Sequence, residues 1–308
     1  MKQTTFTLLL FAVIALVSCR KDKYDPTINQ YDDDQIKAYI TANGITGMTR
    51  DTSGIYYKII NPGKKDSIIN YSSHISMVFG VSSLDGKYLS TDTIANHYDG
   101  FAGHLVGTTY PLGLNASGLQ TAIHDILKLK GGIMRVIIPS HLAYGVDGAG
   151  SGSSSVTSGR IGGNQSLDYY IHIIDDQWAY DQASIKKYVT QNNLTSVMLP
   201  DPAGFWYQIR QPGTGNVPIT TNTTFDATYT IRLLNSTIID QYNNAGGVSF
   251  EIPNIIKGAQ LGLQKYATAG SLLTLVIPSH LAYGDIASSI MPANSVVTYE
   301  VQVISVAP

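Results

Sequence analysis

The sequence has little cysteine and little charge. Cys19 is the only cysteine among 308 residues, so no disulfide can form within one chain. Asp, Glu, Lys and Arg make up 14% of the chain, whereas an average soluble protein has roughly 25%. The formal net charge is −2, so no large positive field exists to attract nucleic acid phosphates. These shortages exclude a disulfide-stapled scaffold and set nucleic-acid binding aside.

Apolar residues, in contrast, are plentiful. They make up 44% of the chain, which is enough for a folded protein with a buried core. The length corresponds to about two domains of ordinary size. Tyr is the dominant aromatic residue, with 20 copies against 7 Phe and 2 Trp. This mixture favours β-structure with a polar, weakly charged surface.

Residues 1–18 are typical of a signal peptide. Lys2 supplies a positive charge, and residues 6–17 form an apolar run that is too short to span a bilayer comfortably. The run ends at Leu16-Val17-Ser18-Cys19, which resembles the lipobox of bacterial lipoproteins, whose cysteine is lipidated. This resemblance implies a membrane anchor on Cys19. The expected location is the cell envelope, at the outer membrane on its periplasmic or surface side.

Residues 19–34 are predicted to be a flexible tether behind the lipidated cysteine, because they are polar and charged and show no periodicity. The run Asp32-Asp33-Asp34 lacks the alternating ligand spacing and the glycine of a calcium-binding loop. We expect it to be the solvated N-terminus of a helix.

The remaining chain contains two copies of one unit. Gly54–Gly63 resembles Gly204–Gly213, and the eight residues IPSHLAYG occur identically at Ile138–Gly145 and Ile277–Gly284. The order of the segments is kept while their spacing changes, which indicates surface insertions in the first copy. We place the boundary near residues 176–181, so that residues 35–176 form the first unit and residues 177–308 the second.

Hydrophobic periodicity predicts the same elements in both copies. Each opens with an amphipathic helix, and each has one further helical stretch among β-type segments. The predicted helices are 33–43, 119–129, 181–193 and 256–266; the predicted strands are 55–60, 75–81, 135–138, 169–174, 205–209, 228–234, 272–277 and 296–304. A few antiparallel strands wrapped on a central short helix make an α+β unit. The fold class is therefore α+β, in two tandem units.

Three motifs in the second copy resemble the C-terminal half of an FKBP-type peptidyl-prolyl isomerase domain. They are Ile255–Gly258, Val276–Gly284 and Met291–Val301. The family patterns there are V-I-x-G-W, I-P-x-x-L-A-Y-G and I-P-P-N-x-x-L-x-F-x-V. In the first copy Ile138–Gly145 and Ile161–Asn164, leading to Tyr169, match the same patterns. Leu84–Lys87 resembles a different family feature, the L-x-D-G-K turn after the first long strand. The resemblance covers most of residues 50–308 and implies two tandem FKBP-like units.

The resemblance also implies a site for polypeptides that contain an Xaa-Pro bond. The family's catalytic positions correspond here to Tyr229, Asp240, Ile256, Tyr283 and Tyr299. The substrate-binding positions correspond to Val248, Phe250, Ile255 and Ala259 in the second unit, and to Phe79, Tyr144 and Tyr169 in the first. Neither a cofactor nor a metal is implied, because rotation about a prolyl bond requires no nucleophile or metal.

The chain departs from the family pattern at several of these positions. In the second copy Ile239 stands where an aromatic residue is usual, and Ala259 replaces the tryptophan of the pocket floor. In the first copy Leu89-Ser90 replaces Phe-Asp, and Ala122 is taken as the counterpart of the tryptophan. We therefore expect the second unit to be the isomerase, possessing weakened turnover, and the first to be a degenerate domain.

Two other functions remain open. The substituted positions also fit a non-catalytic FKBP-like lipoprotein that binds peptides or a partner. The tyrosine content and low charge fit a β-rich adhesion or glycan-binding protein, although the repeated IPSHLAYG motif counts against it. A prolyl isomerase that assists the folding of exported proteins is the preferred interpretation.

The histidines are not expected to be catalytic or to bind metal. His141 and His280, inside the repeated motif, have no acidic or nucleophilic neighbour at fixed spacing, and we expect capping or loop packing. A second group, His97, His104, Asp92 and Asp99, fits no established metal-ligand spacing. The Gly- and Ser-rich run 148–163 occupies the loop that rims the pocket in this family, and its composition predicts mobility.

Overall fold

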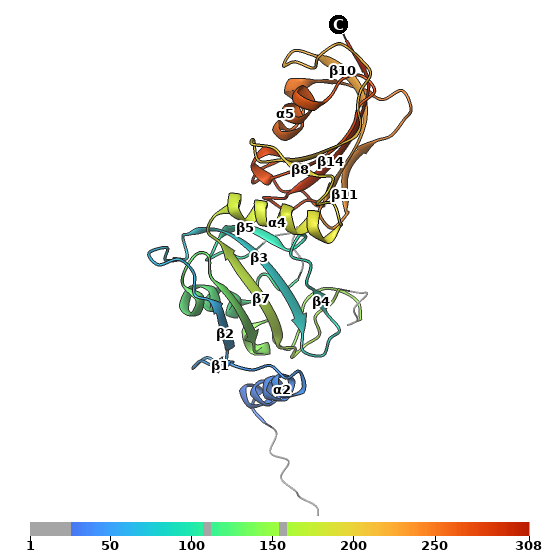
Figure 1. Ribbon diagram of the computed structural model, residues 1–308. Helices are drawn as coiled ribbons and strands as arrows, with labels where there is room; N and C mark the ends of the chain where they lie inside the picture. The colour runs from blue at the N-terminus through green and yellow to red at the C-terminus, as the bar shows by residue number, and fades with distance from the viewer. Residues whose placement is uncertain (1–25, 107–111, 154–158, 308) are drawn as a thin grey trace, which may run out of the picture.

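The computed structural model describes residues 26–106, 112–153 and 159–307. It contains two seven-stranded antiparallel sheets, one in each unit, arranged one above the other with helix α4 between them (Figure 1). The predicted α+β fold class is confirmed. The predicted signal peptide and Cys19 lie outside the described residues. Within the described ranges, no helix combines the length and the apolar composition needed to cross a bilayer.

The first unit opens with a helix, continues through five strands and a helical segment, and ends with two long strands. In chain order the elements are α2 (Ile28–Ala42), β1 (Thr49–Arg50), β2 (Tyr56–Asn61), β3 (His74–Ser83), β4 (Leu89–Ser90), β5 (His97–Phe101), α3 (Ser117–Thr121), a π-helix (Ala122–Leu127), β6 (Ile133–Ile138), a 3-10 helix (Ser140–Leu142) and β7 (Leu167–Ile174). The sheet order is β1-β2-β6-β7-β3-β4, and β5 also pairs with β3.

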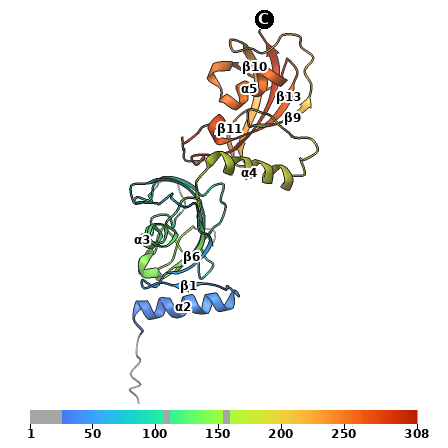
Figure 2. The ribbon, with the colours of Figure 1, turned by 60° about the vertical axis from the view of Figure 1, so that its left-hand side comes forward.

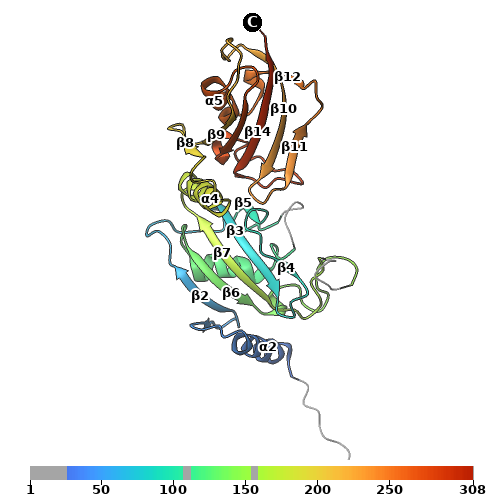
Figure 3. The same cartoon turned by 45° about the vertical axis from the view of Figure 1, so that its right-hand side comes forward.

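The second unit repeats this order. Its elements are α4 (Gln177–Gln191), β8 (Leu199–Pro200), β9 (Trp206–Gln211), β10 (Thr224–Leu233), β11 (Ile238–Tyr242), β12 (Val248–Glu251), a 3-10 helix (Ile252–Asn254), α5 (Lys257–Tyr266), β13 (Leu272–Ile277), a 3-10 helix (Ser279–Leu281) and β14 (Val297–Val306). Figure 3 shows β14, β10 and β11 side by side, in agreement with the order β11-β10-β14-β13-β9-β8. Each of the eight predicted strands is present, whereas the six short strands were not predicted.

Each sheet is covered by a helix on both faces. In the second unit, Leu275 packs on the side of α5 while its neighbour Val276 packs against Ile185 of α4. Adjacent residues of a strand point to opposite faces, which is why one strand serves both layers. In the first unit α2 likewise packs on the face opposite α3, through Ile36 and Ile137. Figure 2 shows α2 at one end of the molecule and α4 between the sheets. Helices near α2 and α4 were predicted, but their packing on the second face of each sheet was not.

Helix α2 begins earlier than predicted. It starts at Ile28, inside the segment expected to be a tether, because Thr27 and Gln30 form a capping box: the Thr27 side chain accepts from the Gln30 amide, and Gln30 Oε1 accepts from the Thr27 amide. The flexible tether predicted for residues 19–34 is therefore wrong from Ile28 onward.

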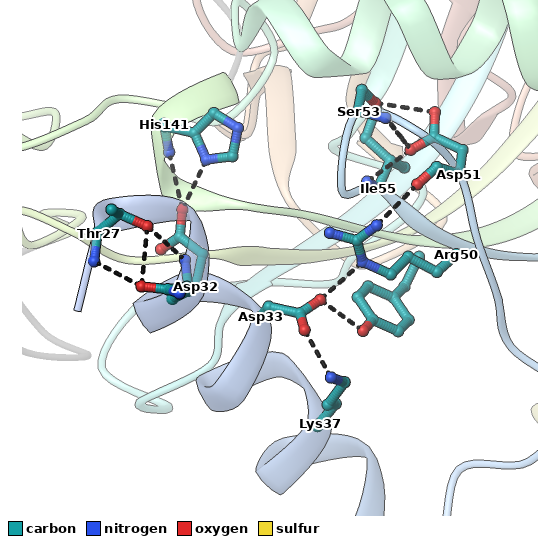
Figure 4. A network of polar contacts seen from close by, with 11 residues as sticks. Thr27, Asp32, Asp33, Lys37, Arg50, Asp51, Ser53, Ile55 and His141 are labelled. Carbon is teal, nitrogen blue, oxygen red and sulfur yellow. Dashed lines mark hydrogen bonds and ion pairs between the residues drawn. The ribbon is translucent and has the colours of Figure 1, made fainter.

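Asp32 is not the solvated residue that we expected. It is 1% exposed, and its carboxylate accepts a hydrogen bond from Ser140 Oγ at 2.7 Å. The same carboxylate accepts from the His141 amide at 3.2 Å and lies 2.8 Å from His141 Nδ1 (Figure 4). Its neighbour Asp33 lies toward the surface and binds Lys37 at 2.6 Å and Arg50 at 2.7 Å. The hydrogen bond from Lys37 lowers the pKa of Asp33.

The second unit has the same interaction between a buried aspartate of its leading helix and the serine of its IPSHLAYG motif. Asp181 of α4 is fully buried, and its carboxylate accepts from the Ser279 amide at 2.8 Å and from Ser279 Oγ at 2.6 Å. His280 contacts the Trp178 ring instead, with centroids 5.0 Å apart. The serine in each IPSHLAYG motif therefore joins the leading helix to the end of a core strand. This packing role agrees with the expectation that His141 and His280 are structural.

Candidate functional site

Three aromatic side chains share one face of the second sheet. Tyr229 of β10 and Tyr299 of β14 stack with ring centroids 6.0 Å apart, and Phe250 of β12 meets the Tyr229 ring edge-on at 5.3 Å. The register explains the stacking: Tyr299 is paired with Ile231, and Tyr229 lies two residues away on the same face. We call Tyr229, Phe250 and Tyr299 the aromatic floor.

Asp240 of β11 stands at the edge of this floor. It is exposed, and its carboxylate accepts a hydrogen bond from the Tyr229 hydroxyl at 2.8 Å. Burial, together with this carboxylate, raises the pKa of Tyr229 to about 12. Burial and then the charge of Asp240 raise the pKa of Tyr283, and burial followed by Tyr229, Tyr283 and Asp240 raises that of Tyr299. The four groups therefore lie within electrostatic reach of one another.

Tyr283, Ile255 and Ile256 complete the site. All three are half-buried and pack against the same core cluster as Tyr229 and Phe250. In the part of the chain that the structure describes, neither the Tyr283 hydroxyl nor the Ile256 amide has a hydrogen-bond partner. Both groups are therefore available as donors to a ligand that lies on the aromatic floor.

Two expected substrate-binding positions lie at the margin of this arrangement. Val248 is half-buried at the start of β12, paired with Ala227. Ala259 of α5 is fully buried within the core. The structure thus brings together Tyr229, Asp240, Ile256, Tyr283 and Tyr299 with Phe250 and Ile255, and it places Ala259 beneath them.

The corresponding region of the first unit is occupied by its own chain. Tyr169 donates a hydrogen bond to the Gly113 carbonyl at 2.7 Å, and the Tyr144 hydroxyl accepts from the Gly113 amide at 2.8 Å and donates to Asn115 Oδ1 at 2.5 Å. Tyr88 donates to the Leu112 carbonyl at 2.7 Å. The insertion segment Leu112–Asn115 therefore forms hydrogen bonds with the hydroxyl groups of Tyr88, Tyr144 and Tyr169.

This closure contradicts our expectation for the first unit. Phe79 and Tyr169 are both 0% exposed, and the Tyr144 hydroxyl is fully engaged by Gly113 and Asn115. The structure therefore does not present Phe79, Tyr144 and Tyr169 as an open substrate-binding site, contrary to our expectation. The cause is an insertion for which the second unit has no equivalent length of chain.

In the first unit one position assignment is kept and one changes. Ser90 is paired with Val81 as Asp240 is paired with Ile231, so Leu89-Ser90 keeps the place of Ile239-Asp240. A Cβ on Gly118 would meet Ile138 Cγ2 at 2.5 Å, and one on Gly258 would meet Ile277 Cγ2 at 2.4 Å, so the two glycines are equivalent. The residue after Gly118 is Leu119, which therefore replaces Ala122 as the tryptophan counterpart. The glycine at the second residue of each helix carries the signal for this alignment.

The histidines and aspartates of the first unit's insertion take separate partners. His97 Nε2 lies 2.8 Å from Ser76 Oγ, while Asp92 accepts from Asn235 and Asp99 from Asn294 of the second unit. Among the described residues, no cluster of three or more His, Cys, Asp or Glu side chains is arranged to hold a metal ion.

Comparison with known proteins agrees with this site. Residues 215–304 match the family model of the FKBP-type peptidyl-prolyl cis-trans isomerases. Over these residues the second unit is similar to the FKBP family. The matched segment contains the whole aromatic floor, Asp240 and Tyr283, so the resemblance seen in the sequence is confirmed.

Similar FKBP proteins come from bacteria and animals. FkpA of Buchnera aphidicola (subsp. Schizaphis graminum) is 30% identical over 105 residues, covering 34% of this chain and 41% of the relative. FkpA of Aeromonas hydrophila is 28% identical, covering 41% of this chain and 47% of the relative. Rat FKBP9 is 24% identical, covering 72% of this chain and 32% of the relative. The chain thus spans less than half the length of these relatives.

Solved FKBP structures were also found. The crystal structure of FkpA from Escherichia coli is 27% identical, with a TM-score of 0.37, and covers 42% of this chain and 61% of that chain. The three FKBP domains of wheat FKBP73 are 16% identical, with a TM-score of 0.32, and cover 85% of this chain and 99% of that chain.

Proposed function

We propose that this protein is a peptidyl-prolyl cis-trans isomerase, that its second unit carries the activity, and that it assists the folding of exported proteins. The observation that carries the proposal is that Asp240 and Tyr283 lie beside the aromatic floor formed by Tyr229, Phe250 and Tyr299. The match of residues 215–304 to the FKBP-type isomerase model supports the same activity.

The mechanism follows from what rotation of a prolyl bond requires. The barrier of about 18–20 kcal/mol arises because rotation breaks amide resonance. A site that holds the twisted imide more tightly than the planar one lowers this barrier. The proline ring packs against Tyr229, Ile255 and Ile256, above the Tyr299 ring, which is 2% exposed. The Tyr283 hydroxyl and the Ile256 amide donate to the carbonyls on either side of the bond.

Asp240 has an orienting role in this scheme. It accepts a hydrogen bond from the Tyr229 hydroxyl. This bond fixes the Tyr229 ring in its edge-on contact with Phe250. Ala259 in place of the tryptophan removes an apolar contact worth about 1–3 kcal/mol, so turnover is slow relative to a site that keeps the indole. This substitution favours the alternative function, a non-catalytic peptide-binding protein, and the experiment below separates the two.

The first unit, in this proposal, supports the second and does not catalyse. The protein is anchored in the cell envelope through a lipid on Cys19, at the outer membrane on its periplasmic or surface side. The signal-like residues 1–18 and the lipobox resemblance support this location. Its substrates are Xaa-Pro-containing polypeptides that have crossed the inner membrane.

The test is NMR exchange spectroscopy on an Xaa-Pro peptide with the full chain from residue 20 onward. We expect acceleration over the uncatalysed rate, and a loss of about ten- to a hundredfold in Asp240→Ala, because a hydrogen bond to a charged group is worth about 1.5–3 kcal/mol. Tyr283→Phe is expected to fall similarly. The matched control, Tyr144→Phe in the closed first unit, retains full activity.

Two outcomes contradict the proposal. If the wild-type chain produces no acceleration but the peptide still broadens the signals of the second unit, the non-catalytic alternative holds. If Tyr144→Phe lowers the rate as much as Tyr283→Phe does, the activity resides in both units.

A further inference from the structure

The same groove occurs in both units, and only one copy of it is filled. In the first unit an open groove of about 660 Å³ runs between α2 and the sheet. Its lining includes Tyr31, Gln35, Leu84, Asn164, Gln165 and Ser166. The counterparts in the second unit are Tyr180, Ser184, Leu234, Asn294, Ser295 and Val296, and there only about 30 Å³ remains because Thr93, Ile94 and His97 of the first unit close it.

The closing segment, Thr91–Asp99, which we call the docking loop, is anchored at three points. Ile94 packs against the core cluster of the second unit. Asp92 Oδ2 accepts from Asn235 Nδ2 at 2.6 Å, and Asp99 Oδ2 accepts from Asn294 Nδ2 at 2.5 Å. Three separate contacts, one aliphatic and two between a carboxylate and an amide, fix the orientation of the docking loop on the second unit.

Asn294 connects the docking loop with the candidate site, because it forms hydrogen bonds to both. Its backbone, at φ 54°, donates a hydrogen bond to the Gly284 carbonyl at 2.7 Å. Gly284 directly follows Tyr283, whose hydroxyl serves the proposed function. Asp99 is therefore connected to Tyr283 through one side-chain hydrogen bond, one backbone hydrogen bond and one peptide unit.

The docking loop also faces the rim that follows Tyr283. A cavity of about 270 Å³ separates Ser90, Ala95 and Asn96 from residues 287–292 of that rim. The rim exposes two aliphatic side chains, Ile286 at 64% and Ile290 at 52%. These two side chains give the rim an exposed aliphatic surface.

The first unit provides the internal comparison. Asn164 has the same backbone, with φ 54° and a hydrogen bond to the Gly145 carbonyl at 2.7 Å. Among the described residues, however, its buried Oδ1 has no partner. The backbone turn therefore forms without an aspartate. The hydrogen bond to Asp99 is an additional contact of Asn294, and it links the turn to the first unit.

We propose that the docking loop of the first unit positions the pocket rim of the second, with Asp99 as a positioning residue that acts through Asn294 on Tyr283. The placed rim favours substrates with apolar residues beside the prolyl bond, through Ile286 and Ile290. This inference rests on the proposed function for its substrate preference, whereas the positioning itself does not depend on activity.

Hydrogen exchange tests the positioning on the full chain without substrate. Asp99→Ala and Asn294→Gly are expected to raise the exchange rates of amides in residues 285–292 by about tenfold, since each removes the side-chain contact. Glycine preserves the positive φ of residue 294. Asn164→Gly is the matched control, because the equivalent amide has no aspartate partner, and it leaves exchange in 285–292 unchanged. Unchanged exchange in both Asp99→Ala and Asn294→Gly overturns the positioning role.

Kinetics test the substrate preference. For peptides with Leu beside the Xaa-Pro pair, Asp99→Ala is expected to raise KM several-fold with little change in kcat, and for peptides with Ser there KM stays nearly constant. Equal effects on both peptides, or none on either, refute the preference. If the wild-type chain has no isomerase activity the proposed function fails, and the exchange experiment still decides whether Asp99 positions the rim.

Discussion

Acidification is predicted to destabilise the first unit through His97. This side chain is 3% exposed, and its Nε2 lies 2.8 Å from Ser76 Oγ. The Ser76 hydroxyl donates to Gln177 Oε1 at 2.9 Å, so its single hydrogen is used and His97 must be the donor in the other bond. A neutral imidazole satisfies this arrangement, and burial lowers the pKa of His97 from 6.5 to about 4.

The direction and size of the effect follow from these two pKa values. Between pH 6.5 and about 4 the unfolded chain binds a proton at His97 that the folded unit does not bind. The stabilisation is therefore complete above about pH 6.5 and is lost as the pH falls through about 4. At 1.36 kcal/mol per pH unit, the loss amounts to about 3 kcal/mol. Burial also lowers the pKa of His172, which adds a loss in the same direction.

The stability of the first unit is measured by amide hydrogen exchange along β3 and β5. The rates are taken from pH 7.5 to pH 4 and corrected for the intrinsic rate at each pH. Both tryptophans, Trp178 and Trp206, lie in the second unit, so their fluorescence reports denaturation there. We expect His97→Gln to lose about 3 kcal/mol less than the wild type over this range. His104→Gln, at an exposed position, is the control and behaves as the wild type does. An equal loss in His97→Gln and the wild type would refute the reasoning.

Three further changes have defined outcomes. Asp32→Ala and Asp181→Ala each leave buried donors without an acceptor and are expected to cost about 2–5 kcal/mol in the unit that carries them, measured by denaturant titration. Gly258→Ala places a Cβ 2.4 Å from a core isoleucine and is expected to cost about 1–3 kcal/mol, whereas Gly246→Ala, with nothing within 4 Å, changes the melting temperature little. Tyr169→Phe leaves a buried carbonyl unpaired and costs about 1–3 kcal/mol in the first unit, seen as faster hydrogen exchange in β7.

The repeat and the periodicities predict most of the scaffold. The strand predicted at 272–277 matches β13, and the helix predicted at 256–266 begins one residue early against α5. These signals are local, because a residue's neighbours in the chain determine its pattern of apolar positions. Short strands such as β4, at Leu89–Ser90, carry too few residues to show a period.

The motifs predict which residues belong to the candidate site. They do not predict whether the hydroxyl groups of those residues are bonded within the chain or available to a ligand. Tyr144 and Tyr283 occupy identical eight-residue motifs, yet one hydroxyl is taken by Gly113 and Asn115 while the other is free within the described structure. The difference arises from an insertion about 30 residues before the motif, whose conformation depends on how it packs against the sheet.

The contact between the units was likewise beyond the sequence. Asp99 and Asn294 are separated by 195 positions, and Asp32 and His141 by 109. No periodicity relates residues at such separations, since their meeting depends on the registers of two sheets and on the helix between them. What the chain determined by itself was the order of its helices and strands and the chemistry of its motifs. Which of two equal motifs stays open, and what holds its rim, was decided by packing, because those contacts exist only once distant segments have been brought together.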